Sequence, residues 1–300
     1  MRKGLTLASI VFFTVSAFAQ TVSEEEVKEK VFVKNAFINT QLISAQTTEM
    51  LPKKSWEFKI QHRFAKTGFD STLVQEFLGM DQTANIRLAL GYSLGERLYI
   101  AVGRTKFLKT YDFEAKYLLL KQHKEQTIPV SVAFYGNMAI RTEKFPTVPQ
   151  NAFFSDWKTP FKYKSAQRYS YNTQMIISSK ITDALSLQLT PIFVYHNLVS
   201  PGQVNHTLAA TLSGRYKIGL NSAIIFEYGH VINHRKQRGE NFVNPGAIGV
   251  EFGTSGHCFQ IFVSSTQSIL DQYIYTNSSI PYSDAEFLIG FNIKRNFWRR

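Results

Sequence analysis

Apolar and polar residues alternate along most of the chain from residue 55 onward. Residues 56–64 read WEFKIQHRF and residues 111–119 read YDFEAKYLL. A period of two predicts β-strands, because successive side chains of a strand point to opposite faces. Most segments are close to the ~9–11 residues that a tilted membrane strand needs. We predict about twelve strands, at residues 55–64, 83–92, 97–105, 110–119, 128–140, 168–179, 184–195, 207–216, 220–230, 246–253, 257–266 and 285–297.

The connections between these segments differ in length in an ordered way. If the strands run up and down, the tight connections share one end, and most long ones share the other. Short periplasmic turns and long external loops are typical of outer-membrane barrels. We therefore predict an all-β, antiparallel, up-and-down transmembrane β-barrel with both termini in the periplasm; a soluble exported β-sandwich is the alternative. The tight turns are 93–96, 180–183, 217–219 and 254–256, and the long loops are 65–82, 141–167, 196–206, 231–245 and 267–284.

Two local features modify this pattern. Pro191 falls inside a predicted strand, and proline cannot donate to a strand ladder, so we expect a bulge or a shifted strand end there. Residues 73–80 in the first long loop predict a short helix.

The N-terminus predicts export. Arg2 and Lys3 precede an apolar stretch at 5–18, and Ala17 and Ala19 supply the small residues that a signal peptidase reads. A buried N-terminal helix is the alternative interpretation. No later window approaches the ~20 continuous apolar residues of a membrane-spanning helix. We expect a signal peptide at 1–19, a periplasmic lead at 20–50 with a charged start (SEEEVKEK), and a barrel at 51–300, in the outer membrane of a gram-negative bacterium.

Composition changes the picture in two respects. The 300 residues are 44% hydrophobic and 14% aromatic, which excludes a disordered chain, and the single Cys excludes an internal disulfide. A formal charge of +12 would favour nucleic acid as a partner, but export argues against it. We instead expect the rings to face lipid and much of the charge to lie in external loops, facing an anionic lipid or ligand. These loop cations are Arg141, Lys144, Lys158, Lys162, Lys164, Arg235, Lys236 and Arg238.

The polar faces of the predicted strands carry nearly balanced charge. Such a face could form charged hydrogen bonds across a narrow lumen. Twelve strands at ~4.8 Å spacing and ~40° tilt give a backbone radius of about 12 Å, which long side chains could largely fill. The acids are Glu57, Asp112, Glu114, Glu227, Glu251 and Glu286, and the bases are Lys59, Arg63, Arg87, Lys116, Arg168, Arg215, Lys217 and Lys294.

Short motifs in the first strands resemble a known family. Residues 56–64 are similar to its first strand, EFxIxHRF; residues 77–82 (FLGMDQ) with 86–88 (IRL) look like its second, and residues 97–112 like its third and fourth. The family comprises exported β-barrel proteins of unknown function that are common in Bacteroidetes. The resemblance runs from about residue 40 to the C-terminus. It implies an outer-membrane barrel, and it implies no ligand, reaction or active site.

The C-terminus also resembles a barrel feature. Residues 296–298 (NFW) resemble the aromatic finish that barrel-assembly machinery reads, although Arg299 and Arg300 follow. We expect that machinery and outer-membrane lipid as partners.

Candidate chemistry is sparse, and we predict no catalytic, cofactor or metal residues. Four histidines would lie in two neighbouring external loops, where a metal site is conceivable but solvated side chains are the simpler interpretation. His257 and Cys258 are adjacent in a strand, so their side chains should face opposite ways. The four loop histidines are His196, His206, His230 and His234.

Three functions remain open at this point. We favour a non-enzymatic barrel that forms a narrow or occluded channel or transporter for a small solute. The alternatives are a non-conducting scaffold or binding barrel acting through basic external loops, and a lipid-modifying barrel enzyme. No G-x-S-x-G motif marks a nucleophile for the last of these.

Overall fold

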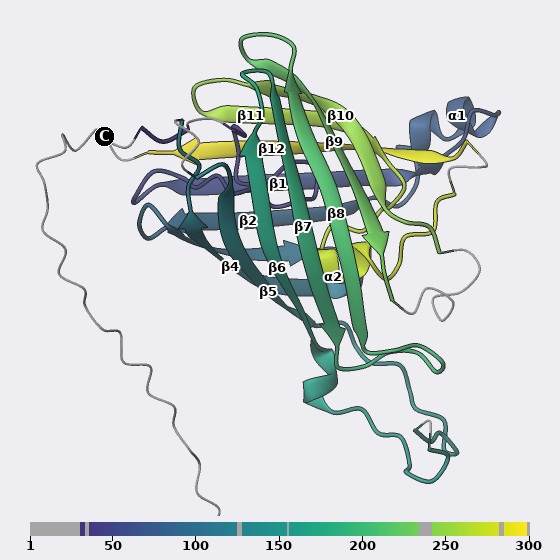
Figure 1. Cartoon of the computed structure of the whole chain (residues 1–300). Coiled ribbons are helices and arrows are strands. Elements are labelled where there is room, and N and C mark those ends of the chain that lie inside the picture. The colour runs from purple at the N-terminus through teal and green to yellow at the C-terminus, as the bar shows by residue number, and fades with distance from the viewer. Residues whose placement is uncertain are drawn as a thin grey trace, which may run out of the picture. The chain divides into compact units, whose positions relative to one another are not determined.

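A closed, all-antiparallel barrel of twelve strands forms in the residues that the computed structural model describes, which are 31–33, 36–124, 128–154, 156–233, 242–281 and 285–298 (Figure 1). Each strand pairs with its neighbours in sequence, and β1 pairs with β12 to close the barrel. The predicted fold class and strand number are confirmed. The strands are β1 Trp56–Thr67, β2 Asn85–Ser93, β3 Leu98–Thr105, β4 Thr110–Leu120, β5 Ser131–Arg141, β6 Tyr169–Lys180, β7 Leu185–His196, β8 His206–Lys217, β9 Ser222–Val231, β10 Gly246–Gly253, β11 His257–Ser264 and β12 Phe287–Phe297.

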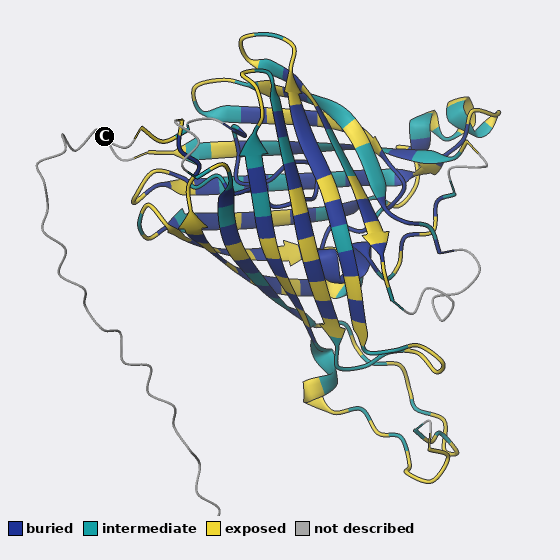
Figure 2. Ribbon diagram, in the orientation of Figure 1, coloured by how far each residue is buried: buried dark blue, intermediate teal, exposed yellow. Residues whose placement is uncertain are grey.

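The alternation of the sequence becomes two different barrel surfaces. Buried and exposed positions alternate along the strands, as the banding in Figure 2 shows. The outward face exposes large apolar side chains such as Leu88, Leu90, Val102, Phe113 and Tyr117. A continuous apolar exterior of this kind is suited to lipid. The inward face is mostly polar and charged, and it is almost fully buried.

The two ends of the barrel carry different connections. At one end, which we call the turn end, residues 94–97, 181–184, 218–221 and 254–256 form short turns, and the connection between β4 and β5 is longer. At the other end, which we call the loop end, the connections are long. The longest is residues 142–168, and the short connection 106–109 is the exception. The first residue of β1 and the last residue of β12 pair with each other and lie at the turn end. The sorting by length therefore matches the sequence prediction.

Short helical pieces occur in the loops. α1 (Thr72–Gln75) and a 3-10 turn (Phe77–Gly79) stand where a helix was predicted at 73–80. They do not form one regular helix, because Phe77 and Leu78 have positive φ angles of 41° and 60°. Gly79 also has a positive φ, and a Cβ there would lie 2.3 Å from the Ala65 carbonyl oxygen. Another 3-10 turn, Phe107–Lys109, follows β3, a third, Ser165–Arg168, precedes β6, and α2 (Asp271–Ile274) lies in the last loop. No helix in the described part of the chain is long and apolar enough to cross a membrane.

Pro191 is accommodated without the predicted bulge or shifted end. β7 runs through Pro191, which faces Ala210 of β8. On the β6 side, Gln174 pairs with Ile192 and Ile177 pairs with Leu189, so the register is unchanged across the proline. The ladder simply lacks the pairs between them, because proline has no N–H to donate. The expectation of a bulge was wrong: the barrel tolerates a local gap in one ladder.

Candidate functional site

Ion pairs link strands β1, β2 and β4 on one side of the lumen wall. Arg87 of β2 reaches two acids of β4, with its Nη2 atom 2.5 Å from Asp112 Oδ2 and 2.5 Å from Glu114 Oε1. Lys59 of β1 lies 3.2 Å from the other oxygen of Glu114, and Gln61 accepts a further bond from Arg87 at 2.8 Å. All of these side chains are buried. Charges removed from water are stabilised when they are paired and hydrogen-bonded, as the Arg87 guanidinium is by Asp112, Glu114 and Gln61.

A second pair lies elsewhere on the wall. Arg215 of β8 donates to Glu251 of β10 at 2.8 Å, and Gln260 of β11 donates to the same carboxylate at 2.9 Å. The predicted polar face thus includes charges that pair across strands. Three of its predicted members lie elsewhere: Lys217 is exposed at the turn end, and Arg168 and Glu286 lie at the loop end.

A hairpin from the N-terminal side occupies the lumen. We call Ala36–Thr48 the plug hairpin; none of its thirteen residues is charged. Its two arms are joined by bonds from Thr47 N to Thr40 O (3.0 Å) and from Leu42 N to Ala45 O (2.8 Å). It contacts strands all around the barrel, among them β1, β4, β7, β9 and β12. The sequence prediction assigns residues 20–50 to a periplasmic lead, so the hairpin is a part of that lead found inside the barrel; the boundaries at 19, 20, 50 and 51 stay predictions.

Three wall cations hold the plug hairpin by its carbonyl groups. Lys116 of β4 donates to Thr40 O and Thr47 O, both at 2.9 Å, and so bridges the two arms. Arg63 of β1 donates to Ile43 O at 3.1 Å, and Lys294 of β12 donates to Gln41 O. None of the three cations has an acidic side chain within ion-pair distance in the described structure. Each instead has main-chain oxygens of the hairpin as acceptors.

Three wall acids accept hydrogen bonds from the hairpin. Glu251, which is already paired with Arg215, accepts from Asn39 Nδ2 at 3.2 Å, and the other two have no cationic partner. Glu227 of β9 accepts the backbone N–H groups of Ser44 and Ala45, both at 2.9 Å. Glu57 of β1 accepts the hydroxyl of Thr40 at 2.8 and 2.9 Å, together with the Tyr99 hydroxyl. Among the described charges on the strands of the lumen wall, those without an opposite charge as partner therefore all bond to the hairpin. These five are Glu57, Arg63, Lys116, Glu227 and Lys294.

Apolar contacts complete the seat of the plug hairpin. Phe37, Leu42 and Ile43 form a buried cluster with Ile225 of β9 and Phe262 of β11. Inward apolar residues on a mostly polar barrel wall would be costly if they faced water. The wall therefore matches the hairpin in apolar surface as well as in hydrogen-bond donors and acceptors.

A second segment enters from the loop end. We call residues 265–280, which carry α2, the inner loop; Figure 1 shows α2 behind β8, within the barrel. Gln272 donates to Asn137 Oδ1 at 2.5 Å, and the hydroxyls of Tyr275 and Thr211 lie 2.6 Å apart. Asp271 accepts amide donors of β6 at 2.8 and 3.0 Å and has no cationic partner among the described residues. Burial, and then the negative charges of Glu227 and Glu114, raise the pKa of the Asp271 carboxyl to about 8.

The residues considered for metal or nucleophilic chemistry do not converge. His196 Nε2 lies 3.0 Å from Gln272 O, and His230 bonds to Asn244, while His206 stands opposite Tyr195 at a strand start. His234 lies outside the described residues. No group of three or more His, Cys, Asp or Glu in the described ranges is placed to hold a metal ion.

His257 and Cys258 face opposite ways. His257 contacts Arg295 on the exposed side, and the Cys258 thiol is buried 3.7 Å from Glu251. This is the arrangement that strand geometry predicts.

Sequence reasoning missed the plug hairpin. Its wall contacts are largely to main-chain atoms, which every sequence has, and they join residues up to 253 positions apart. One local pattern could have drawn attention to it: the thirteen-residue run of 36–48 has no charge, although it lies between Lys34 and Glu49 in a charged lead.

Solved structures of a porin, an outer membrane channel and an outer membrane phospholipase are similar to the chain. The NanC porin matches with a TM-score of 0.50 at 9% identity, covering 79% of this chain and 98% of that one. An outer membrane channel from Pseudomonas putida F1 (TM-score 0.43, 12% identity, 83% and 98% covered) and an active-site mutant of outer membrane phospholipase A from Escherichia coli (0.43, 10%, 82% and 91%) are more distant. At such identities the likeness is one of fold. No curated protein matches the sequence.

The family assignment agrees with the barrel and with the motifs of its first strands. A family model described as a membrane bound beta barrel domain (DUF5777) matches residues 37–297. The match begins within the plug hairpin and ends at the last residue of β12. The chain belongs to this family of membrane-bound β-barrel domains.

Proposed function

We propose that the protein is an outer-membrane channel for small solutes that its plug hairpin and inner loop hold closed. The observation that carries this proposal is the match between the wall and the hairpin. Five wall charges lack an opposite charge, and all five bond to one uncharged segment. A wall built only to be filled would be served as well by apolar side chains, because a buried charge without a partner is costly.

The way the hairpin is attached supports reversible occlusion. It joins the barrel through residues 49–55 at the turn end. Its hydrogen bonds to the wall are made with side chains of the strands, outside the strand ladders. Its withdrawal would break those bonds and leave every strand pair intact. The wall would then expose three cations and two acids to water. Water would hydrate these five charges, so none of them would need an opposite charge in the open barrel.

A disulfide that locks the hairpin to the wall tests this proposal. Thr48 Oγ1 and Ser178 Oγ of β6 lie 2.5 Å apart, so cysteines at both positions would be within bonding range. The pair Thr48→Cys and Ser178→Cys is introduced with Cys258→Ala, which removes the native thiol. Single-channel current is recorded in planar bilayers from the full chain, first reduced and then oxidised.

The proposal expects openings in the reduced protein that disappear on oxidation and return with reductant. Thr48→Cys alone, in the same Cys258→Ala background, should conduct equally under both conditions. A folded, heat-modifiable barrel that never conducts when reduced contradicts the channel. Openings that survive complete oxidation contradict the role of the hairpin.

A binding role at the loop end is the second candidate. In the 142–168 loop, Phe145 stacks on Tyr163 at 4.0 Å, Arg168 lies 3.9 Å from the Phe145 ring, and Trp157 is 82% exposed. Exposed lysines lie in the same loop as these aromatic rings. Their positive charge favours contact with the phosphates of an outer-leaflet lipid. Weaker cosedimentation with anionic vesicles when these lysines become Gln would support it. The lysines are Lys144, Lys158, Lys162 and Lys164.

A further inference from the structure

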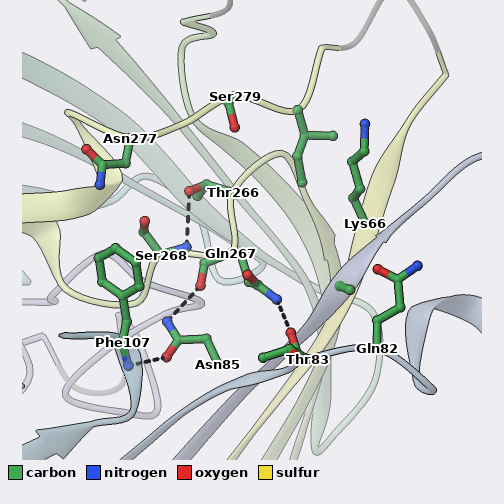
Figure 3. Close-up of a pocket in the computed structure, with 12 residues that line it drawn as sticks. Lys66, Gln82, Thr83, Asn85, Phe107, Thr266, Gln267, Ser268, Asn277 and Ser279 are labelled. Carbon is green, nitrogen blue, oxygen red and sulfur yellow. Dashed lines mark hydrogen bonds between the residues drawn. The ribbon is translucent and has the colours of Figure 1, made fainter. Parts of the chain in front are cut away.

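A polar cavity opens at the loop end, separate from the plug hairpin. Its volume is about 600 Å³, which is in the usual range of small-molecule sites. The end of β1, the β1–β2 loop, the start of β2, the 3-10 turn at Phe107 and the inner loop all contribute to it (Figure 3). The cavity therefore joins two loops that are distant in sequence, next to the segment that enters the lumen.

Hydrogen bonds fix the frame of this cavity. Gln267 donates to Thr83 O at 2.8 Å and to Phe64 O at 3.2 Å, which ties the inner loop to the first loop (Figure 3). Asn85 donates to Gln267 O at 3.0 Å and accepts from Phe107 N at 3.2 Å. A frame held in this way loses little freedom when a ligand binds, and pre-organisation of that kind favours affinity.

Other lining side chains keep their hydrogen-bonding capacity. Gln82, Asn277 and Ser279 line the cavity, and their side chains have no hydrogen-bond partner in the described structure. Each carries both a donor and an acceptor. The cavity thus offers two amides and a hydroxyl, with further hydroxyls from Thr83 and Ser268.

The charge of the cavity is nearly neutral. Lys66 is its charged lining residue, and the Lys66 ammonium lies 2.6 and 2.7 Å from the two carboxylate oxygens of Glu286. An anionic ligand would have to compete with that carboxylate, and a cationic ligand would meet no free acid in the lining. Phe107 adds an aromatic ring beside Tyr273, 5.2 Å between centroids.

We propose that this cavity is an external binding site for a neutral carbohydrate of one or two rings. A sugar presents hydroxyls that both donate and accept, which suits amides and hydroxyls, and it presents apolar C–H faces, which pack on an aromatic ring. The inference deepens the proposed function and rests on it in one respect: the bound sugar is the solute offered to the channel. Binding itself requires no conduction.

Equilibrium binding to the full-length barrel in detergent tests the site. Isothermal titration with glucose, galactose, maltose, cellobiose and lactose is compared with glucuronic acid and glucosamine. At least one neutral sugar should bind more tightly than the charged ones. Gln82→Ala and Asn277→Ala should each weaken it roughly 3- to 10-fold, as the loss of one or two hydrogen bonds does. Gln203→Ala, an amide in the exposed 197–205 loop, is the matched control and should change nothing.

The inference is overturned if none of the five neutral sugars binds below 10 mM, or if Gln82→Ala and Asn277→Ala leave their binding unchanged. Tighter binding of glucuronic acid or of glucosamine than of every neutral sugar would overturn the assigned ligand class. Sugar binding to a barrel that never conducts would retain the site and reject the channel. Conduction with no sugar binding would retain the channel and reject the sugar site.

Discussion

Replacing Lys116 by Met should release the plug hairpin more often. The Lys116 ammonium bridges the two arms through Thr40 O and Thr47 O, both at 2.9 Å. Hydrogen bonds to charged groups contribute about 1.5–3 kcal/mol each, so losing both weakens the closed state by about 3 kcal/mol after rehydration of the carbonyls. At about 1.4 kcal/mol per tenfold change, the ratio of open to closed barrels should rise about 100-fold.

Open probability in planar bilayers measures this ratio directly. Lys217→Met removes an equal charge from an exposed site at the turn end and should leave open probability unchanged. A heat-modifiable gel shift verifies that both variants are folded. Equal open probability in wild-type protein and a folded Lys116→Met variant would refute the assignment of Lys116 as a holder of the plug.

Further variants test the rest of the barrel. Arg87→Met leaves Asp112 buried without its cation, so the free energy of unfolding should fall by about 3–5 kcal/mol, measured by urea unfolding on gels. Because the pKa of Asp271 is raised to about 8 in the folded protein, its ionisation opposes docking of the inner loop, and stability should be lost as pH rises from about 4 to 8. Hydrogen exchange of 270–275, corrected for intrinsic rates, should be faster at pH 9 than at pH 5 in wild type, and Asp271→Asn should remove the difference. Pro191→Val should restore a ladder bond to β6 and stabilise the barrel by about 1 kcal/mol, seen as a higher gel-shift temperature; an unchanged temperature would count against a missing bond.

The barrel itself was predictable from sequence because one physical rule governs it. A strand between lipid and a polar interior must alternate, and each of the twelve predicted segments overlaps an observed strand. Loop lengths then gave the two ends. The prediction of a bulge at Pro191 was wrong. It assumed that a proline in a paired strand must shift the register, whereas here one ladder lacks its pairs locally and the register is kept. That tolerance depends on the neighbouring pairs, which a single segment does not reveal.

The contents of the lumen were predictable only in kind. Balanced charges on the polar faces indicated pairing, and Arg87 with Asp112 and Glu114 is an example. Which charges lack a partner depends on the register between strands that are far apart in sequence. The plug hairpin is recognised through main-chain atoms, so its side chains carry little record of the wall that holds it. The sequence likewise placed Asp271 in an external loop at 267–284, whereas in the structure this residue is buried inside the barrel.

Replacing the plug hairpin by a length-matched Gly-Ser linker tests the central claim most directly. Residues 36–48 are exchanged, all strands are retained, and single-channel current is compared with wild type in the same bilayers. The account predicts that the folded linker variant conducts small ions persistently, whereas the wild-type barrel is closed for most of the recording. A folded linker variant as silent as wild type would contradict it.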